Sequence, residues 1–198
     1  MKMIERFEEY EGKKFRYLAS EENGKAGILL MHGYNFYAEI WKECGLLDML
    51  SDLGYGFISL DVPGFPRSQS KFRLSTKEFK EFLNHVIGKH FSANPVILGS
   101  SASGFLALDY ATSRGNIKAV IAVAPVNIRE LNLSLIKIPV LGIWGSLDTV
   151  SDPSSSELIR KLRYGRAEII EGAGHACYLD KPEEFNRLIR EFLNGLRR

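Results

Sequence analysis

The chain has 198 residues, a length that suits one domain with a sizeable apolar core. Apolar residues make up 45% of it and charged residues 25%, which is typical of a globular protein. The formal net charge of +2 is too small to indicate nucleic acid or a membrane surface as a partner.

The cysteines and the beginning of the chain bear on its location. Cys44 and Cys177 have no metal-type spacing and imply no disulfide framework. Residues 1–9 are acidic and polar, unlike a signal peptide, and no apolar run approaches the length of a membrane span. We therefore expect a single domain over residues 1–198, located in the cytoplasm.

The predicted strands and helices alternate along the chain. A β-hairpin is expected at 3–10 and 13–19, further strands at 27–31, 55–61, 95–98, 119–124, 140–144 and 168–170, and helices at about 38–53, 75–90, 105–110, 152–165 and 182–196. Continuous apolar strands that alternate with helices indicate an α/β fold with a mainly parallel, eight-stranded sheet and helices on both faces. Ligands bind such a sheet at the carboxyl ends of its strands.

Residues 95–104 are the most informative stretch. An apolar strand ends abruptly in six small residues and a helix-compatible run follows, which is the layout of a nucleophile elbow. This turn crowds the positions two before and two after the nucleophile. Ser101, flanked there by Gly99 and Ser103, fits better than Ser100 or Ser103, although the last glycine of the usual G-x-S-x-G pattern comes one residue late. The alternative is an ordinary strand-to-helix loop with a serine N-cap.

A serine hydroxyl is a poor nucleophile at neutral pH and needs a base. Of the four histidines, His85 and His90 fall in the predicted helix 75–90, where most histidines are surface or packing residues. His32 directly follows a strand. His175 lies in a glycine-rich loop after the last strand, from which its imidazole can reach the elbow, so we predict that His175 is the base.

A histidine base needs an acid that holds its tautomer and stabilises the imidazolium. Asp61 ends an early strand, Asp152 is expected to cap a helix, and Asp180 lies beyond the histidine. Asp148 follows the strand 140–144. In folds with this elbow the order along the chain is serine, acid, histidine, and this order favours Asp148.

The oxyanion that develops in the transition state needs preorganised N–H donors. Ala102 supplies one at the start of a helix, where the helix dipole helps. The loop that follows the strand 27–31 should supply the second from the backbone of Tyr34, with His32 in a structural role. The alternative for this loop is a simple turn at the end of a strand.

These segments together resemble the α/β-hydrolase superfamily. The resemblance rests on Leu30-Met31-His32-Gly33-Tyr34, Leu60-Asp61-Val62-Pro63-Gly64-Phe65, Gly99-Ser100-Ser101-Ala102-Ser103-Gly104, Gly145-Ser146-Leu147-Asp148 and Gly172-Ala173-Gly174-His175, followed by Lys181-Pro182-Glu183-Glu184-Phe185, and covers about 27–196. The serine turn and the string that begins Gly-Ala-Gly-His are similar to small capless hydrolases first described as partners of a transcription-initiation factor. That resemblance implies esterase activity on small activated esters, or acyl transfer from lysine to coenzyme A.

Only residues 125–138 separate two neighbouring strands at the position where many members of the superfamily insert a helical lid, and this is too short for one. We therefore expect no lid domain and an open site. The loop 65–68 also departs from the family's glycine-rich version. The expected pocket lining, in which the aromatic members have core packing as the alternative, is Tyr34, Asn35, Phe36, Phe65, Phe105, Val150 and Tyr178.

The sequence thus predicts a serine carboxylesterase for short acyl chains, with Ser101, His175 and Asp148 as its triad and with no metal or cofactor. One alternative is an acyltransferase or deacylase that passes the acyl group to a thiol such as coenzyme A. Another is a non-catalytic interaction module on a hydrolase scaffold. The expected partner is a small acyl ester, with no nucleic acid and no membrane, and no protein partner is indicated.

Overall fold

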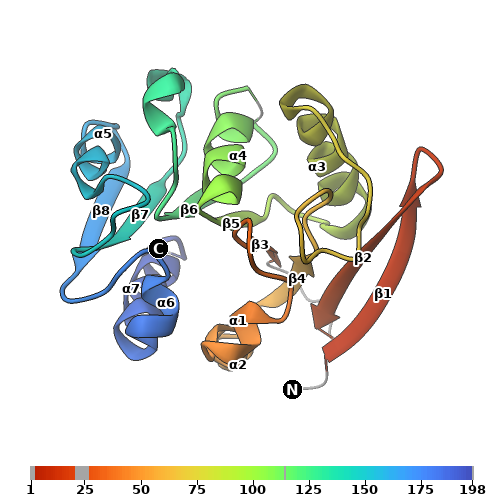
Figure 1. Cartoon of the computed structure of the whole chain (residues 1–198), viewed down its shortest axis with the longest axis horizontal. Coiled ribbons are helices and arrows are strands. Elements are labelled where there is room, and N and C mark those ends of the chain that lie inside the picture. The colour runs from red at the N-terminus through yellow and green to blue at the C-terminus, as the bar shows by residue number, and fades with distance from the viewer. Residues whose placement is uncertain (1–2, 21–26, 114, 198) are drawn as a thin grey trace.

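The computed structural model describes residues 3–20, 27–113 and 115–197, through which one eight-stranded sheet runs (Figure 1). The strand order is β1-β2-β4-β3-β5-β6-β7-β8. The hairpin of β1 (Met3–Tyr10) and β2 (Lys13–Ser20) is antiparallel, and β2 also pairs antiparallel with β4. Every later pair of neighbours in the sheet is parallel. The predicted mainly parallel, eight-stranded sheet is confirmed.

The central strands are covered on both faces. The six strands after the hairpin are β3 (Gly27–Met31), β4 (Gly56–Leu60), β5 (Val96–Ser100), β6 (Ala119–Val123), β7 (Val140–Gly145) and β8 (Gly165–Ile170). Every residue of β5, β6 and β7 is buried, on both sides of the pleat. Continuous apolar runs in these strands therefore follow from a sheet that lies between two helical layers.

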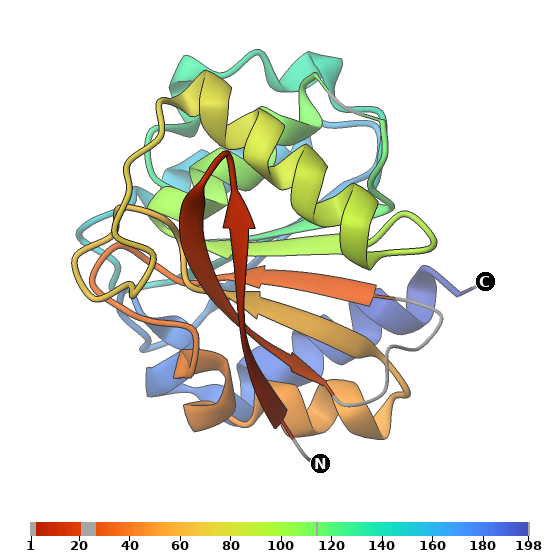
Figure 2. The same ribbon diagram turned by 90° about the vertical axis from the view of Figure 1, so that its right-hand side faces the viewer.

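The two helical layers are visible above and below the sheet in Figure 1, and edge-on in Figure 2. One layer holds α3 (Thr76–His90), α4 (Ala102–Ala111) and α5 (Ser156–Arg160); the other holds α1 (Ile40–Glu43), α2 (Leu46–Asp52), α6 (Cys177–Asp180) and α7 (Pro182–Gly195). Each layer buries its own apolar cluster against the sheet. Most of the stability of such helices comes from this burial rather than from helix propensity.

Three elements differ from the prediction. The helix expected over 38–53 is two short helices, because Gly45 adopts a left-handed φ of 73° between them. The helix expected over 152–165 is a 3-10 turn, η3 (Pro153–Ser155), followed by α5, which ends at Arg160. Gly165 instead begins β8, where a Cβ atom would lie 1.8 Å from the carbonyl oxygen of Ile159. The one-turn helix α6 was not predicted.

The connection between β6 and β7 carries only two 3-10 turns, η1 (Ile128–Glu130) and η2 (Leu133–Leu135). No lid covers the carboxyl edge of the sheet within the described residues. Among these residues, too, no helix has the length and apolar character needed to cross a membrane.

Candidate active site

Ser101 sits on a sharp turn between β5 and α4. Its φ of 56° and ψ of −117° are rarely adopted by a residue with a side chain, and such backbone strain concentrates at functional sites. The Ser101 N–H donates to the carbonyl of Val123 over 2.8 Å, and the Ser101 carbonyl accepts from Phe105 N over 3.1 Å. A Cβ at Gly99 would lie 2.3 Å from the Ser103 carbonyl oxygen, which explains why the position two before the serine is glycine.

The structure brings Ser101, His175 and Asp148 into one line of hydrogen bonds. His175 Nε2 lies 2.9 Å from Ser101 Oγ, and His175 Nδ1 lies 2.9 Å from Asp148 Oδ2. When Nδ1 carries the proton and donates it to the carboxylate, Nε2 is free to accept the serine proton. The three residues follow β5, β7 and β8, so all of them lie at the carboxyl edge of the sheet.

The Asp148 side chain is fully buried and held by several donors. Its carboxylate accepts from the backbone N–H of Val150 at 2.8 Å and of Ser151 at 3.0 Å, and from the Ser151 hydroxyl at 2.6 Å. Desolvation by itself raises the pKa of Asp148, but the hydrogen bonds from Ser151, His175 and Val150 outweigh it and bring the pKa below its ordinary value. Asp148 is therefore ionised at neutral pH. No pattern in the sequence indicates this role of Ser151.

The backbone N–H groups predicted for the oxyanion hole belong to Tyr34 and Ala102. Tyr34 follows the end of β3, and Ala102 is the first residue of the ten-residue helix α4. No backbone or side-chain acceptor among the described residues takes up either N–H. Both donors are thus available to an atom that is not part of the protein chain.

Five of the other candidate histidines and aspartates have structural roles. The buried His32 accepts from Val62 N through Nε2 at 3.0 Å, so its Nδ1 carries the proton and donates to the Gly33 carbonyl at 2.8 Å. Asp180 accepts from Gly174 N at 2.7 Å and so fixes the loop that carries His175, a role that the sequence analysis missed. His90 bonds Glu8, Asp152 caps η3, and Asp61 accepts from Arg16, Ala38 N and Gln69 N.

An uncharged cavity of about 330 Å³ opens beside Ala102. It is lined by Tyr34, Pro63, Phe65, Leu74, Thr76, Phe79, Ala102, Phe105, Leu106, Val126 and Asn127. Three of the predicted lining residues, Tyr34, Phe65 and Phe105, are among them. The rings of Tyr34 and Phe65 meet edge to face, with centroids 5.2 Å apart. The cavity therefore offers an apolar recess next to the serine turn.

The other predicted lining residues lie outside this cavity, and the prediction that Tyr178 lines the pocket is wrong. Helix α6 turns the Tyr178 ring into the core, where it is 1% exposed and packs against Phe36 and Trp41. Burial also raises the pKa of its phenol. Phe36 lies against this core ring, and Asn35 and Val150 are exposed on the surface. The orientation of Tyr178 depends on the one-turn helix α6. Because the sequence did not predict this helix, it could not show that the ring points into the core.

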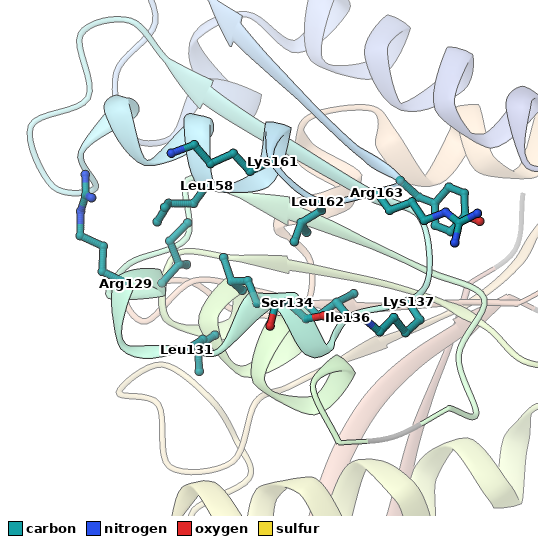
Figure 3. A pocket seen from close by; sticks show the side chains of 12 residues that line it. Arg129, Leu131, Ser134, Ile136, Lys137, Leu158, Lys161, Leu162 and Arg163 are labelled. Atoms are coloured by element: carbon teal, nitrogen blue, oxygen red, sulfur yellow. Dashed lines mark hydrogen bonds between the residues drawn. The ribbon is translucent and has the colours of Figure 1, made fainter.

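A larger cavity of about 850 Å³ lies between the η1–η2 segment and α5 (Figure 3). Its lining is Ile128, Arg129, Leu131, Leu133, Ser134, Ile136, Lys137, Leu158, Lys161, Leu162, Arg163 and Tyr164. None of the predicted site residues is among them, so this cavity is separate from the serine turn. Among the described residues, no group of three or more His, Cys, Asp or Glu side chains is placed to hold a metal ion.

The amino-acid sequence was compared with protein families and with known proteins. Residues 22–131 match the family model described as serine aminopeptidase, S33. ABHD14B of Homo sapiens, whose name describes it as a candidate protein-lysine deacylase, is 32% identical over 186 residues, which cover 90% of this chain and 88% of that protein. Protein ABHD14A of Rattus norvegicus is 30% identical over 90% of this chain and 76% of its own length.

Solved structures agree with these sequence matches. A crystal structure described as a predicted CIB-like hydrolase from Thermoplasma acidophilum superimposes with a TM-score of 0.89 at 31% identity, over 98% of this chain and 99% of that one. Est1E from Butyrivibrio proteoclasticus, with ferulic acid bound, shares the fold at a TM-score of 0.83 and 15% identity, over 96% and 98% of the two chains. On the family match, the relatives and the sheet topology, the chain is a hydrolase that belongs to the α/β-hydrolase superfamily.

Proposed function

We propose that this protein is a serine carboxylesterase for short acyl chains, with Ser101 as nucleophile, His175 as general base and Asp148 as the acid that orients it. The observation that supports the proposal best is the continuous line of 2.9 Å hydrogen bonds from Ser101 through His175 to Asp148. The uncharged recess beside Ala102 supports an acyl group as the part of the substrate bound there.

In the proposed reaction, Ser101 Oγ attacks the acyl carbon while its proton passes to His175 Nε2. The N–H groups of Tyr34 and Ala102 receive the oxyanion of the tetrahedral intermediate. His175 then gives its proton to the departing alcohol oxygen, which leaves an acyl ester on Ser101. A water molecule deprotonated by His175 attacks this ester, and collapse of the second intermediate returns the proton to Ser101 and releases the carboxylic acid.

A second candidate is removal of an acyl group from a lysine side chain. The name of the human relative, a candidate protein-lysine deacylase, favours it. The same residues would carry out the reaction, but His175 would protonate an amine instead of an alcohol. The acyl group would then pass either to water or to a thiol such as coenzyme A.

The test is covalent labelling combined with turnover. A fluorophosphonate probe should add to Ser101 of the wild-type protein, as located by peptide mass spectrometry. Ser101→Ala should lose both the label and the hydrolysis of p-nitrophenyl acetate, by on the order of 10³-fold or more. Ser100→Ala, which changes the neighbouring buried serine, is the matched control and should keep both. Normal turnover in Ser101→Ala would refute the proposed nucleophile, and an unlabelled, inactive wild type would favour the interaction module.

The two candidate reactions are separated by the acceptor and the leaving group. Turnover of p-nitrophenyl acetate without any thiol supports the esterase. Conversion of an acetyl-lysine peptide to the same peptide with a free lysine amine only when coenzyme A is present, with acetyl-coenzyme A as the second product, supports the acyltransferase instead.

A further inference from the structure

Ser103 occupies the position, two residues after the proposed nucleophile, where the usual elbow pattern has glycine. Its side chain is completely buried, and its hydroxyl bonds in two directions. Ser103 Oγ accepts from the backbone N–H of Ser100 at 2.9 Å. It also lies 2.8 Å from the carbonyl oxygen of Met31 and 3.0 Å from that of Ser100, and it donates its single proton to the nearer of the two, that of Met31.

Met31 is the last residue of β3. The parallel ladder between β3 and β5 ends at the pair Met31 and Gly99, and beyond this pair the two strands part. The first continues into the loop that carries Tyr34, and the second into the turn that carries Ser101 and Ala102. The bond from Ser103 to Met31 therefore joins the two segments at the point where the ladder stops.

The glycine that follows Ser103 has a separate role. A Cβ at Gly104 would lie 3.0 Å from Pro125 Cβ and 3.1 Å from the Gly99 carbonyl oxygen, so a side chain there would have to push these neighbours aside by a few tenths of an ångström. The space that glycine usually leaves open two residues after the nucleophile is filled here by the Ser103 hydroxyl.

We infer that Ser103 is a positioning residue that sets the separation between the N–H groups of Tyr34 and Ala102, and thereby the fit of the oxyanion hole. This inference rests on the proposed serine hydrolase activity. Donors of an oxyanion hole act only when they are fixed at hydrogen-bond distance from the oxyanion, and a displacement of a fraction of an ångström already weakens them. Without the hydroxyl, the Met31 carbonyl and the Ser100 N–H would each lose a buried partner, and the two segments could drift apart.

The test compares an oxygen ester with its thiono analogue, in which sulfur replaces the carbonyl oxygen. Sulfur is larger and a weaker hydrogen-bond acceptor, so the thiono ester gains less from a well-set hole. In Ser103→Ala and Ser103→Gly we expect kcat for the oxygen ester to fall on the order of 10-fold with KM nearly unchanged. The rate for the thiono ester should fall less, so the ratio of the two rates should drop.

Ser59→Ala is the matched control. Ser59 is also fully buried, and its hydroxyl also donates to a backbone carbonyl, that of Ala38, at 2.7 Å. Ser59→Ala should lower the melting temperature without changing the ratio of the two rates. If Ser103 had a merely structural role, its variants would show this same pattern. An unchanged ratio in both Ser103 variants, with active wild type, would overturn the inference. A wild type inactive on both esters would instead refute the proposed function.

Discussion

At the scale of single residues, the Asp148 carboxylate is the most strongly held group of the site. The backbone of Val150 and Ser151, the Ser151 hydroxyl and His175 all donate to it. The first three donors remain whatever the state of His175, so the carboxylate keeps its orientation when the imidazole moves its proton. The Ser151 hydroxyl is thus a fixed support for the proposed acid.

Replacing Asp148 by asparagine tests the proposed role of its carboxylate. The amide has no charge to stabilise the imidazolium and no longer selects the tautomer with the proton on Nδ1, so we expect kcat to fall by about 10³- to 10⁴-fold. The measurement is hydrolysis of p-nitrophenyl acetate at pH 7. Asp152→Asn, an exposed residue that caps η3, is the control and should keep its rate. A loss in Asp148→Asn of less than about tenfold would contradict the assigned role.

The lowered pKa of Asp148 also links stability to pH. The folded protein holds this carboxylate ionised more strongly than the unfolded chain does, whose aspartates titrate near pH 4. The stabilisation is therefore fully present above about pH 4 and is lost as the pH falls through the lower folded value. In a His175→Ala background, which leaves the three donors of Val150 and Ser151 on the carboxylate, the stability advantage of Asp148 over Asp148→Asn should shrink between pH 5.5 and 3, measured by urea unfolding. An advantage that grew toward acid pH would contradict the direction of the shift.

At the scale of elements, the strands could be predicted much better than the short helices. The hairpin follows from the turn at Glu11-Gly12, the central strands follow from their apolar runs, and the capping box of Ser75 and Glu78 places the start of α3. Gly45 and Gly165 misled the prediction, because a glycine in the sequence does not reveal whether it bends a helix or makes room for a neighbouring backbone. The direction of the Tyr178 side chain could not be predicted either, because it depends on the single helical turn α6.

The candidate triad could be predicted because chain order and the glycine-rich loops carry the signal. Its supports could not. Ser151 and Asp180 make contacts that form only after folding, and nothing in their local sequence distinguishes them from ordinary polar residues. The elbow pattern marks the position of Ser103, but it does not reveal the buried hydrogen bond to Met31.

Gly145, at the end of β7, shows how closely the elements of the site approach each other. A Cβ there would lie 2.2 Å from the carbonyl oxygen of Ala173 and 2.3 Å from that of Gly174, directly before His175. Gly145→Ala should push this loop away and lower kcat by about 10-fold or more. Gly88→Ala, in α3 with open space around its Cα, is the control and should keep its rate and gain slightly in melting temperature. Equal activity in the two variants would show that the loop adapts without moving His175.

At the scale of the whole molecule, the carboxyl edge of the sheet has little cover. The described connection from β6 to β7 contributes only η1 and η2, and large apolar side chains such as Leu147 and Val150 stand exposed near the site, at 63% and 64%. Next to the serine turn, the recess of about 330 Å³ beside Ala102 is the space that we propose removes an acyl chain from water.

This shape sets a limit on the acyl group. Each methylene that is fully buried gains about 0.8 kcal/mol, roughly fourfold in kcat/KM, and we expect that gain for only the first few carbons. The measurement is kcat/KM for p-nitrophenyl esters from acetate to laurate, with a maximum at short chains. Phe105→Ala, which enlarges the recess, should move the maximum to longer chains. A steady rise to laurate in the wild type would contradict the open site.

The distances along the chain between the site residues have a consequence for protein synthesis. The hydrogen bonds of His175 reach back 74 residues to Ser101 and 27 residues to Asp148. Because a chain folds from its N-terminus as it is made, the strand and turn that carry Ser101 can take shape while the base is still missing. Under the proposed function, the growing polypeptide therefore carries no activated serine until the segment that follows β8, with His175, docks at the edge of the sheet.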